Sequence, residues 1–135
     1  MKMRFLQVRE PTGDSTHSPG DVANIMSVEA KIDRECFWVL HLNAQNRVIE
    51  RELVSVGTAT NSLIHPREVF RSAVMNGATG IITVHNHPGG RANPSRDDLS
   101  TWEKLDQAGA VLGIKALDHL IITPSGEYYS RSEHS

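Results

Sequence analysis

Apolar runs and apolar–polar alternation along the chain predict five β-strands. The segment 35–43 (ECFWVLHLN) is apolar on both alternating faces, which is typical of a strand buried at the centre of a sheet. The segment 48–57 (VIERELVSVG) alternates more regularly, and the turn-forming AQNR before it predicts a hairpin. The run 80–87 (GIITVHNH) is rich in β-branched residues, which favours a third strand. Residues 115–123 and 126–130 are expected to form a closing hairpin across a Pro-Ser-Gly turn.

Apolar residues three or four positions apart predict three helices, over residues 21–30, 66–77 and 95–113. Asp21 is the expected N-cap of the first helix, and Pro66 suits the first turn of the second. The third helix is expected to end at Gly109 or Gly113. Its core-facing stripe is expected to contain Leu99, Trp102, Leu105 and Ala108.

The order of these elements is helix, two strands, helix, strand, helix and two strands. This order predicts an α/β (α+β) fold in which helices flank a single mixed β-sheet. Residues 1–18, which include VREPTGDSTHS, are rich in turn formers and are expected to be an irregular N-terminal arm. Because the remainder shows no repeat, low-complexity tract or charge run, residues 19–135 are expected to form one domain.

Composition narrows the class of protein without indicating a function. The 135 residues are 39% hydrophobic and 22% charged, as in ordinary globular domains. No apolar run approaches the roughly 20 residues of a membrane helix, and MKMRFLQVREPTG has no signal-peptide h-region. Cys36 is the only cysteine, so no internal disulfide can form and a reducing, cytoplasmic location is expected. The net charge of -2 argues against a free-standing binder of duplex DNA.

Two histidines at the end of the strand 80–87 indicate a metal site. His85 and His87 are two residues apart, and the period of two in a strand places both imidazoles on the same face. Pro88 lacks a donor for the ladder, so the strand should end there. Asp98 follows after a glycine-rich loop and would add a carboxylate. Two histidines, one carboxylate and an open fourth position are typical of catalytic zinc, whereas no CxxC exists to build a structural thiolate site.

The same stretch also matches a capping box, in which Ser95 begins a helix and Asp98 reaches back to the cap. An Asp98 oxygen that binds zinc is poorly placed to accept the cap amide, so the two roles compete. Ser95 could cap the helix through its carbonyl while its hydroxyl faces the site. On spacing alone, the metal site and the capped helix stay equally open. The ligand types also suit non-haem iron, although nothing else in the sequence indicates oxygen chemistry.

The spacing HxHx(7)Sx(2)D, formed by His85, His87, Ser95 and Asp98, resembles the JAMM motif of the MPN (Mov34/JAB) metalloprotease superfamily. More narrowly, the chain resembles the RadC family in three separated segments. These segments are RECFWVLHLNAQNRVI, NSLIHPREVF and HNHPGG. The resemblance covers residues 20–131 and implies the MPN/JAB architecture, which is similar to that of cytidine deaminases.

The resemblance implies a zinc-dependent hydrolase of the JAMM type that cleaves peptide or isopeptide (amide) bonds in a peptide or protein substrate. It implies that His85, His87 and Asp98 bind one Zn2+ per chain and that Ser95 helps to hold the oxyanion. Glu35 matches the glutamate that activates the zinc-bound water. The residues alone do not distinguish Glu35 from the other glutamates, because only the fold could bring it near His85.

Two departures from the family pattern bear on function. Gly89 stands where serine is usual, which removes one hydroxyl from the loop. The stretch before Glu35 is too short for the DNA-associated helix-hairpin-helix region of full-length RadC-like proteins. Two alternatives stay open: a DNA-associated protein of repair or recombination, including a metal-dependent nuclease, and a non-catalytic MPN binding module. The net charge does not support DNA as a partner, and the intact ligand set argues against the binding module.

Several other polar and aromatic side chains have simpler expected roles. Core packing is expected for Cys36, Trp38, His41 and Trp102, and a structural hydrogen-bonding role for His119. His65 is expected to begin a helix, with a place in the cleft as the alternative. Asn86 points to the face opposite the two histidines and is expected to support the loop. Arg91 and Arg96 are expected to be solvated loop charges, with contact to an anionic substrate as the alternative.

Overall fold

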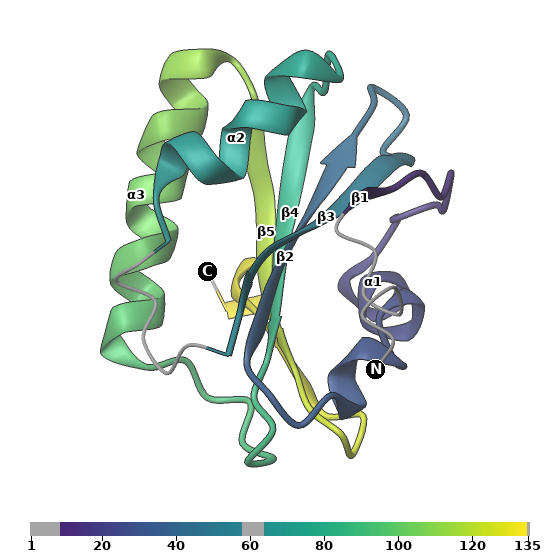
Figure 1. Cartoon of the computed structure of the whole chain (residues 1–135), viewed down its shortest axis with the longest axis vertical. Coiled ribbons are helices and arrows are strands. Elements are labelled where there is room, and N and C mark those ends of the chain that lie inside the picture. The colour runs from purple at the N-terminus through teal and green to yellow at the C-terminus, as the bar shows by residue number, and fades with distance from the viewer. Residues whose placement is uncertain (1–8, 58–63, 135) are drawn as a thin grey trace.

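The computed structural model describes residues 9–57 and 64–134, in which a six-stranded mixed sheet carries helices on both faces (Figure 1). The strand order is β1-β3-β2-β4-β5-β6, with β4 and β5 parallel and the other pairs antiparallel. The elements are β1 (Arg9–Glu10), α1 (Pro19–Ile25), η2 (Glu29–Lys31), β2 (Cys36–Leu42), β3 (Val48–Val56), α2 (Pro66–Met75), β4 (Gly80–Asn86), α3 (Arg96–Leu112), β5 (Lys115–Ile122), β6 (Tyr128–Ser130) and η4 (Arg131–His134). The predicted fold class is confirmed.

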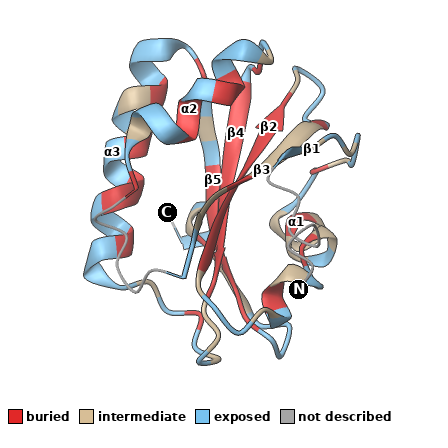
Figure 2. Ribbon diagram, in the orientation of Figure 1, coloured by how far each residue is buried: buried red, intermediate tan, exposed pale blue. Residues whose placement is uncertain are grey.

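An apolar core forms on each face of the sheet, because α1 covers one face while α2 and α3 cover the other (Figure 1). On the α1 face, Val22 and Met26 pack in the same cluster as Val84. On the opposite face, Phe70 of α2 and Leu105 of α3 belong to the second cluster. Strands β2 and β4 are buried along their whole length (Figure 2), as expected of central strands. Within the described ranges, no helix combines the length and the apolar character needed to cross a membrane.

The first helix begins earlier than the sequence predicts. Ser18 is its N-cap, and the Oγ atom of Ser18 accepts a hydrogen bond from the backbone N–H of Asp21 at 3.2 Å. Pro19 can follow the cap directly because the first helical position needs no hydrogen-bond donor. The predicted cap at Asp21 is therefore wrong. The helix also ends at Ile25, and residues 29–31 form the separate 3-10 helix η2.

Helix α3 places a polar residue on its inward stripe. The buried positions of α3 are Asp98, Thr101, Trp102, Leu105 and Gly109. Leu99 lies one position beyond Asp98, about 100° further around the helix, and is 47% exposed. The prediction that Leu99 faces the core is wrong, because it counted apolar residues only. Of the two predicted ends, Gly113 is the C-cap, with a φ of 73° that favours glycine.

Part of the predicted arm pairs with the sheet. Strand β1 lies antiparallel to Arg51 and Glu52 of β3. An Arg51 guanidinium nitrogen lies 2.7 Å from Oε1 of Glu10, which adds an ion pair to this short strand contact. The boundary between an arm at 1–18 and a domain at 19–135 stays a prediction.

His41 is a core histidine, as predicted. Its side chain is fully buried in β2, and its Nδ1 atom lies 2.9 Å from Nδ2 of Asn76. The same amide donates to Oε1 of Glu50 at 3.0 Å, so Nδ1 of His41 is the acceptor and Nε2 carries the proton. Burial lowers the pKa of His41 to about 4 and outweighs the attraction of the Glu50 carboxylate. His41 is therefore neutral at pH 7.

His41 should make the protein sensitive to mild acid. In the unfolded chain it takes up a proton near its ordinary pKa of about 6.5, whereas the folded state resists protonation down to about 4. The stability that neutral His41 provides is present above about pH 6.5 and is lost as the pH falls toward about 4. Between pH 7 and pH 5, the wild type should lose about 2 kcal/mol more unfolding free energy than His41→Gln, which does not titrate. Urea denaturation of both proteins measures the difference, and equal losses would contradict this assignment.

Candidate metal and catalytic site

Strand β4 brings His85 and His87 together at its end. It lies between β2 and β5, and it ends at Asn86, just before Pro88. The backbone N–H of His87 still donates to the carbonyl of Ile122 in β5 at 2.9 Å, which holds the residue beyond the strand. The Nε2 atoms of the two imidazoles lie 3.2 Å apart. The two rings meet as the strand period indicates.

Asp98 reaches the same point from the first turn of α3. Its Oδ1 atom lies 3.2 Å from Nε2 of His85, and its Oδ2 atom lies 3.5 Å from Nε2 of His87. Tetrahedral zinc with bonds of about 2.0–2.1 Å separates its ligand atoms by about 3.3–3.4 Å. The separation of the two Nε2 atoms and that of His85 Nε2 from Asp98 Oδ1, both 3.2 Å, are therefore close to the spacing of ligands that share one ion.

Ser95 and Asp98 form the capping box of α3, so the predicted capping role of Asp98 is confirmed. Oδ2 of Asp98 accepts a hydrogen bond from the backbone N–H of Ser95 at 2.8 Å, while Oδ1 faces His85. The Oγ atom of Ser95 accepts from the backbone N–H of Asp98 at 3.0 Å. Of the two ways in which Ser95 could cap the helix, the structure shows the capping box, in which the hydroxyl oxygen takes part. That bond leaves the hydroxyl proton of Ser95 available for donation.

The surroundings of Asp98 keep its carboxylate ionised. Burial on its own would raise the pKa of Asp98, but hydrogen bonds with His85 and His87 outweigh it and hold the pKa well below its ordinary range. In return, the hydrogen bond with Asp98 raises the pKa of His87 despite burial, and the backbone carbonyl of Arg91 adds to this effect. Asp98 therefore carries a negative charge at neutral pH.

Glu35 lies beside the histidines because β2 and β4 pair in a fixed antiparallel register. Phe37 lies opposite His85, so the residue two positions before Phe37 lies level with His87. A carboxylate oxygen of Glu35 and one nitrogen from each of His85 and His87 all lie within 4.8 Å of one another. Glu35 is half-buried and lines the adjacent cleft. These three residues form a cluster that could hold a metal ion.

Asn86 fixes the backbone on both sides of Glu35. Its fully buried side chain accepts a hydrogen bond from the N–H of Cys36 at 2.7 Å. Its Nδ2 group donates to the carbonyls of Ile32 at 3.0 Å and Arg34 at 2.9 Å. The prediction that Asn86 supports the glycine-rich loop is wrong, because its side chain bonds the segment around the start of β2 instead. Asn86 therefore ties the position of Glu35 to the strand that carries the histidines.

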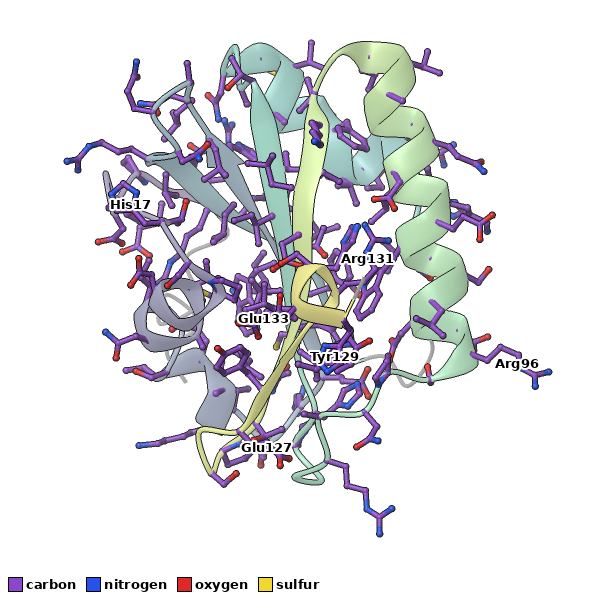
Figure 3. All side chains as sticks on the ribbon, turned by 180° about the vertical axis from the view of Figure 1, so that it is seen from behind. His17, Arg96, Glu127, Tyr129, Arg131 and Glu133 are labelled. Carbon is purple, nitrogen blue, oxygen red and sulfur yellow. The ribbon has the colours of Figure 1, made fainter. Side chains whose placement is uncertain are left out.

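The cleft in front of these groups has a volume of about 370 Å3. It is lined by Glu35, His87, Pro88, Gly89, Arg91, Ser95, Asp97 and Asp98. Arg91 thus borders the cleft, whereas Arg96 extends away from the protein (Figure 3). His65 is the exposed N-cap of α2 and is not one of the lining residues. Asp97 was not identified from the sequence, because an acidic residue in the first turn of a helix is common.

Replacing Asn86 should loosen the segment that carries Glu35. Asn86→Ala removes three hydrogen bonds and leaves the backbone N–H of buried Cys36 without its partner. The free energy of unfolding should fall by about 3 kcal/mol, measured by urea denaturation. Asn93→Ala, at an exposed position in the glycine-rich loop, is the matched control and should change it by less than about 0.5 kcal/mol. An equally small change in Asn86→Ala would contradict the role of Asn86 in holding the segment around Glu35.

Comparison with known proteins supports the resemblance to the RadC family. Residues 16–135 match the RadC-like JAB domain family. A UPF0758 protein of Rubrobacter xylanophilus is 43% identical over 133 residues, which are 97% of this chain and 57% of the relative. In the RadC-like segment NSLIHPREVF, residues 61–63 lie outside the described residues, while His65 and Pro66 begin α2.

Two further relatives also match most of this chain and about half of their own length. A UPF0758 protein of Caldanaerobacter subterraneus is 46% identical over 109 residues, covering 80% of this chain and 47% of the relative. A UPF0758 protein of Chlorobium chlorochromatii is 47% identical over 115 residues, covering 84% of this chain and 51% of the relative. The chain therefore spans about half the length of the curated relatives that it matches.

Proposed function

The chain belongs to the RadC family, whose JAB domain matches residues 16–135, and from this premise we propose that it is a zinc-dependent hydrolase of peptide or isopeptide bonds. One observation carries the proposal. Two imidazoles and a carboxylate meet at the end of β4, and a second carboxylate, that of Glu35, lies beside them in an open cleft. Three protein ligands and an open side are typical of a catalytic zinc site rather than a structural one.

The donor set fits zinc in its atoms and in the tautomer of His87. His85 and His87 offer Nε2, and Asp98 offers an ionised carboxylate. Nδ1 of His87 lies 2.7 Å from the carbonyl oxygen of Arg91. Because a carbonyl only accepts, Nδ1 of the neutral imidazole carries the proton and Nε2 keeps its lone pair. We propose that these three side chains hold one Zn2+ per chain.

Glu35 and Ser95 are suited to the two remaining tasks of amide hydrolysis. Bound zinc supplies a Lewis acid that makes water acidic near neutral pH. Glu35 accepts the proton of the attacking water and passes it to the leaving amine. Asp98 is less suited to that task, because it is buried and bonded in the capping box. The Ser95 hydroxyl donates a hydrogen bond to the developing oxyanion while its oxygen still accepts the cap bond.

The charges of the cleft favour an amide substrate over a nucleic acid. Among its lining residues, Glu35, Asp97 and Asp98 are acidic, and Arg91 is the one residue with a permanent positive charge. A wall of this kind attracts phosphate groups weakly, whereas DNA-binding surfaces are basic. We therefore propose a peptide or protein as the partner. A cytoplasmic location is part of the same proposal and rests on the single cysteine of the sequence.

Metal analysis tests the ligand set. The wild type, purified without chelators and supplied with zinc, should hold about one zinc per chain, and His85→Ala should hold almost none. Asp98→Asn should also lose zinc, although its amide oxygen can still accept the Ser95 cap bond and preserve the helix start. His65→Ala, which alters an exposed histidine outside the cleft, is the matched control and should keep its zinc. Zinc retained in both site variants would contradict the proposed ligands.

If Glu35 transfers protons and does not bind the metal, its replacement should lower catalysis without lowering metal binding. Glu35→Gln should keep its zinc, because the proposed ligands are unchanged, and should lower kcat on amide substrates by about 100-fold to 10,000-fold. Glu29→Gln, which alters a glutamate outside the cleft, is the control and should keep its activity. Equal turnover in Glu35→Gln and wild type would exclude Glu35 as the base.

A further inference from the structure

The two histidines of the site are held in place by different means. Nδ1 of His87 is hydrogen-bonded to the carbonyl of Arg91 at 2.7 Å. Nδ1 of His85 is buried and has no hydrogen-bond partner among residues 9–57 and 64–134. A histidine that binds a metal usually fixes its ring by bonding the other ring nitrogen. Some other contact must therefore orient the ring of His85.

Aromatic rings contact His85 from two different elements. Phe37 of β2 stacks on the imidazole, with 5.8 Å between ring centroids and an angle of 14° between the planes. Trp102 of α3 lies on another side, at 6.2 Å and 56°. Rotation of an imidazole about its terminal torsion is only weakly restricted by intrinsic preference. Because His85 is 1% exposed, its packed neighbours set the orientation of the ring.

The indole of Trp102 is itself held by stacking. It stacks with the ring of His119, at 5.3 Å and 10°, and with the ring of Tyr129, at 6.1 Å and 18°. Its Nε1 atom is buried and lacks a hydrogen-bond partner in the described part of the chain. Figure 3 shows Tyr129 on the side of the sheet that faces α3. Trp102 is therefore fixed by ring contacts and not by a hydrogen bond.

His119 gives this stack a rigid base, because both of its ring nitrogens are bonded. Nε2 lies 2.9 Å from Oδ1 of Asp106, and a carboxylate oxygen only accepts, so Nε2 carries the proton. Nδ1 is then the acceptor for the hydroxyl of Thr83 at 2.5 Å. The other oxygen of Asp106 is paired with Arg131 at 2.6 Å. His119 has one tautomer and one orientation.

We propose that Trp102 is a positioning residue that holds the His85 imidazole, by ring contact, in the orientation that presents Nε2 to the metal. The stack of His119, Trp102 and Tyr129 supplies the rigidity that the missing hydrogen bond at Nδ1 of His85 would otherwise supply. This inference rests on the proposed metal site and is independent of the hydrolytic reaction.

The test measures Zn2+ binding by the full chain in competition with a coloured chelator, together with the visible absorption of the Co2+-loaded protein. Trp102→Leu removes the ring and should weaken Zn2+ binding about tenfold or more, as does the loss of other residues that orient a metal-binding histidine. The Co2+ bands should also shift, because the His85 ring turns. Trp102→Phe keeps a ring at this position and should stay within about threefold of the wild type.

Leu105→Ala is the matched control for a loss of packing. Leu105 is fully buried on the same helix, and no ring contact joins it to His85. This variant should lose stability while its folded form keeps the zinc affinity and Co2+ spectrum of the wild type. If Trp102→Leu does not fold, Thr83→Val takes its place. It removes the hydrogen bond to His119 and should weaken zinc binding about threefold.

The outcomes distinguish a failure of the Trp102 positioning role from a failure of the proposed metal site. Wild-type zinc affinity and Co2+ bands in folded Trp102→Leu, or in Thr83→Val when it is the variant used, would overturn the positioning role and leave the metal site intact. Equal weakening of zinc binding in Leu105→Ala would also overturn it, because any loss of packing would then have the same effect. A wild-type chain that binds no zinc would instead contradict the proposed function.

Discussion

The carboxylate of Asp98 connects the fold to the candidate site. One oxygen closes the capping box that begins α3, while the other faces His85 at the end of β4. The start of the longest described helix and the meeting point of the two histidines are thus fixed by one buried side chain. Burial of a lone carboxylate is costly, and here hydrogen bonds from both sides offset that cost. The same carboxylate therefore serves both the helix cap and the candidate metal site.

Strand β4 serves the candidate site from both of its faces. On the α3 face, Thr83 and His85 point toward the stack that includes His119 and Trp102. On the α1 face, Asn86 bonds the backbone around Glu35. Alternation along one buried strand therefore positions a proposed ligand and the proposed base together. The polar groups that this requires are largely satisfied by hydrogen bonds, which allows them to lie in a central strand.

The features that could be predicted from the sequence are those that follow from periodicity or from a local motif. The buried strands β2 and β4 and the approach of His85 to His87 follow from alternation. The position of Glu35 depends on the pairing register of β2 with β4, which no local pattern specifies. Leu99 was misplaced because the inward stripe of α3 contains a polar residue. The two roles of Asp98 were expected to compete, yet its two oxygens face different partners, the N–H of Ser95 and the ring of His85.

A crystal structure of the zinc-loaded protein, with anomalous diffraction recorded at the zinc edge, tests the central claim most directly. We expect one strong peak about 2.0–2.2 Å from Nε2 of His85, Nε2 of His87 and a carboxylate oxygen of Asp98, with its fourth side open to the cleft beside Glu35. A peak elsewhere, or a zinc ion closed by a fourth protein ligand, would contradict a catalytic metal at the end of β4.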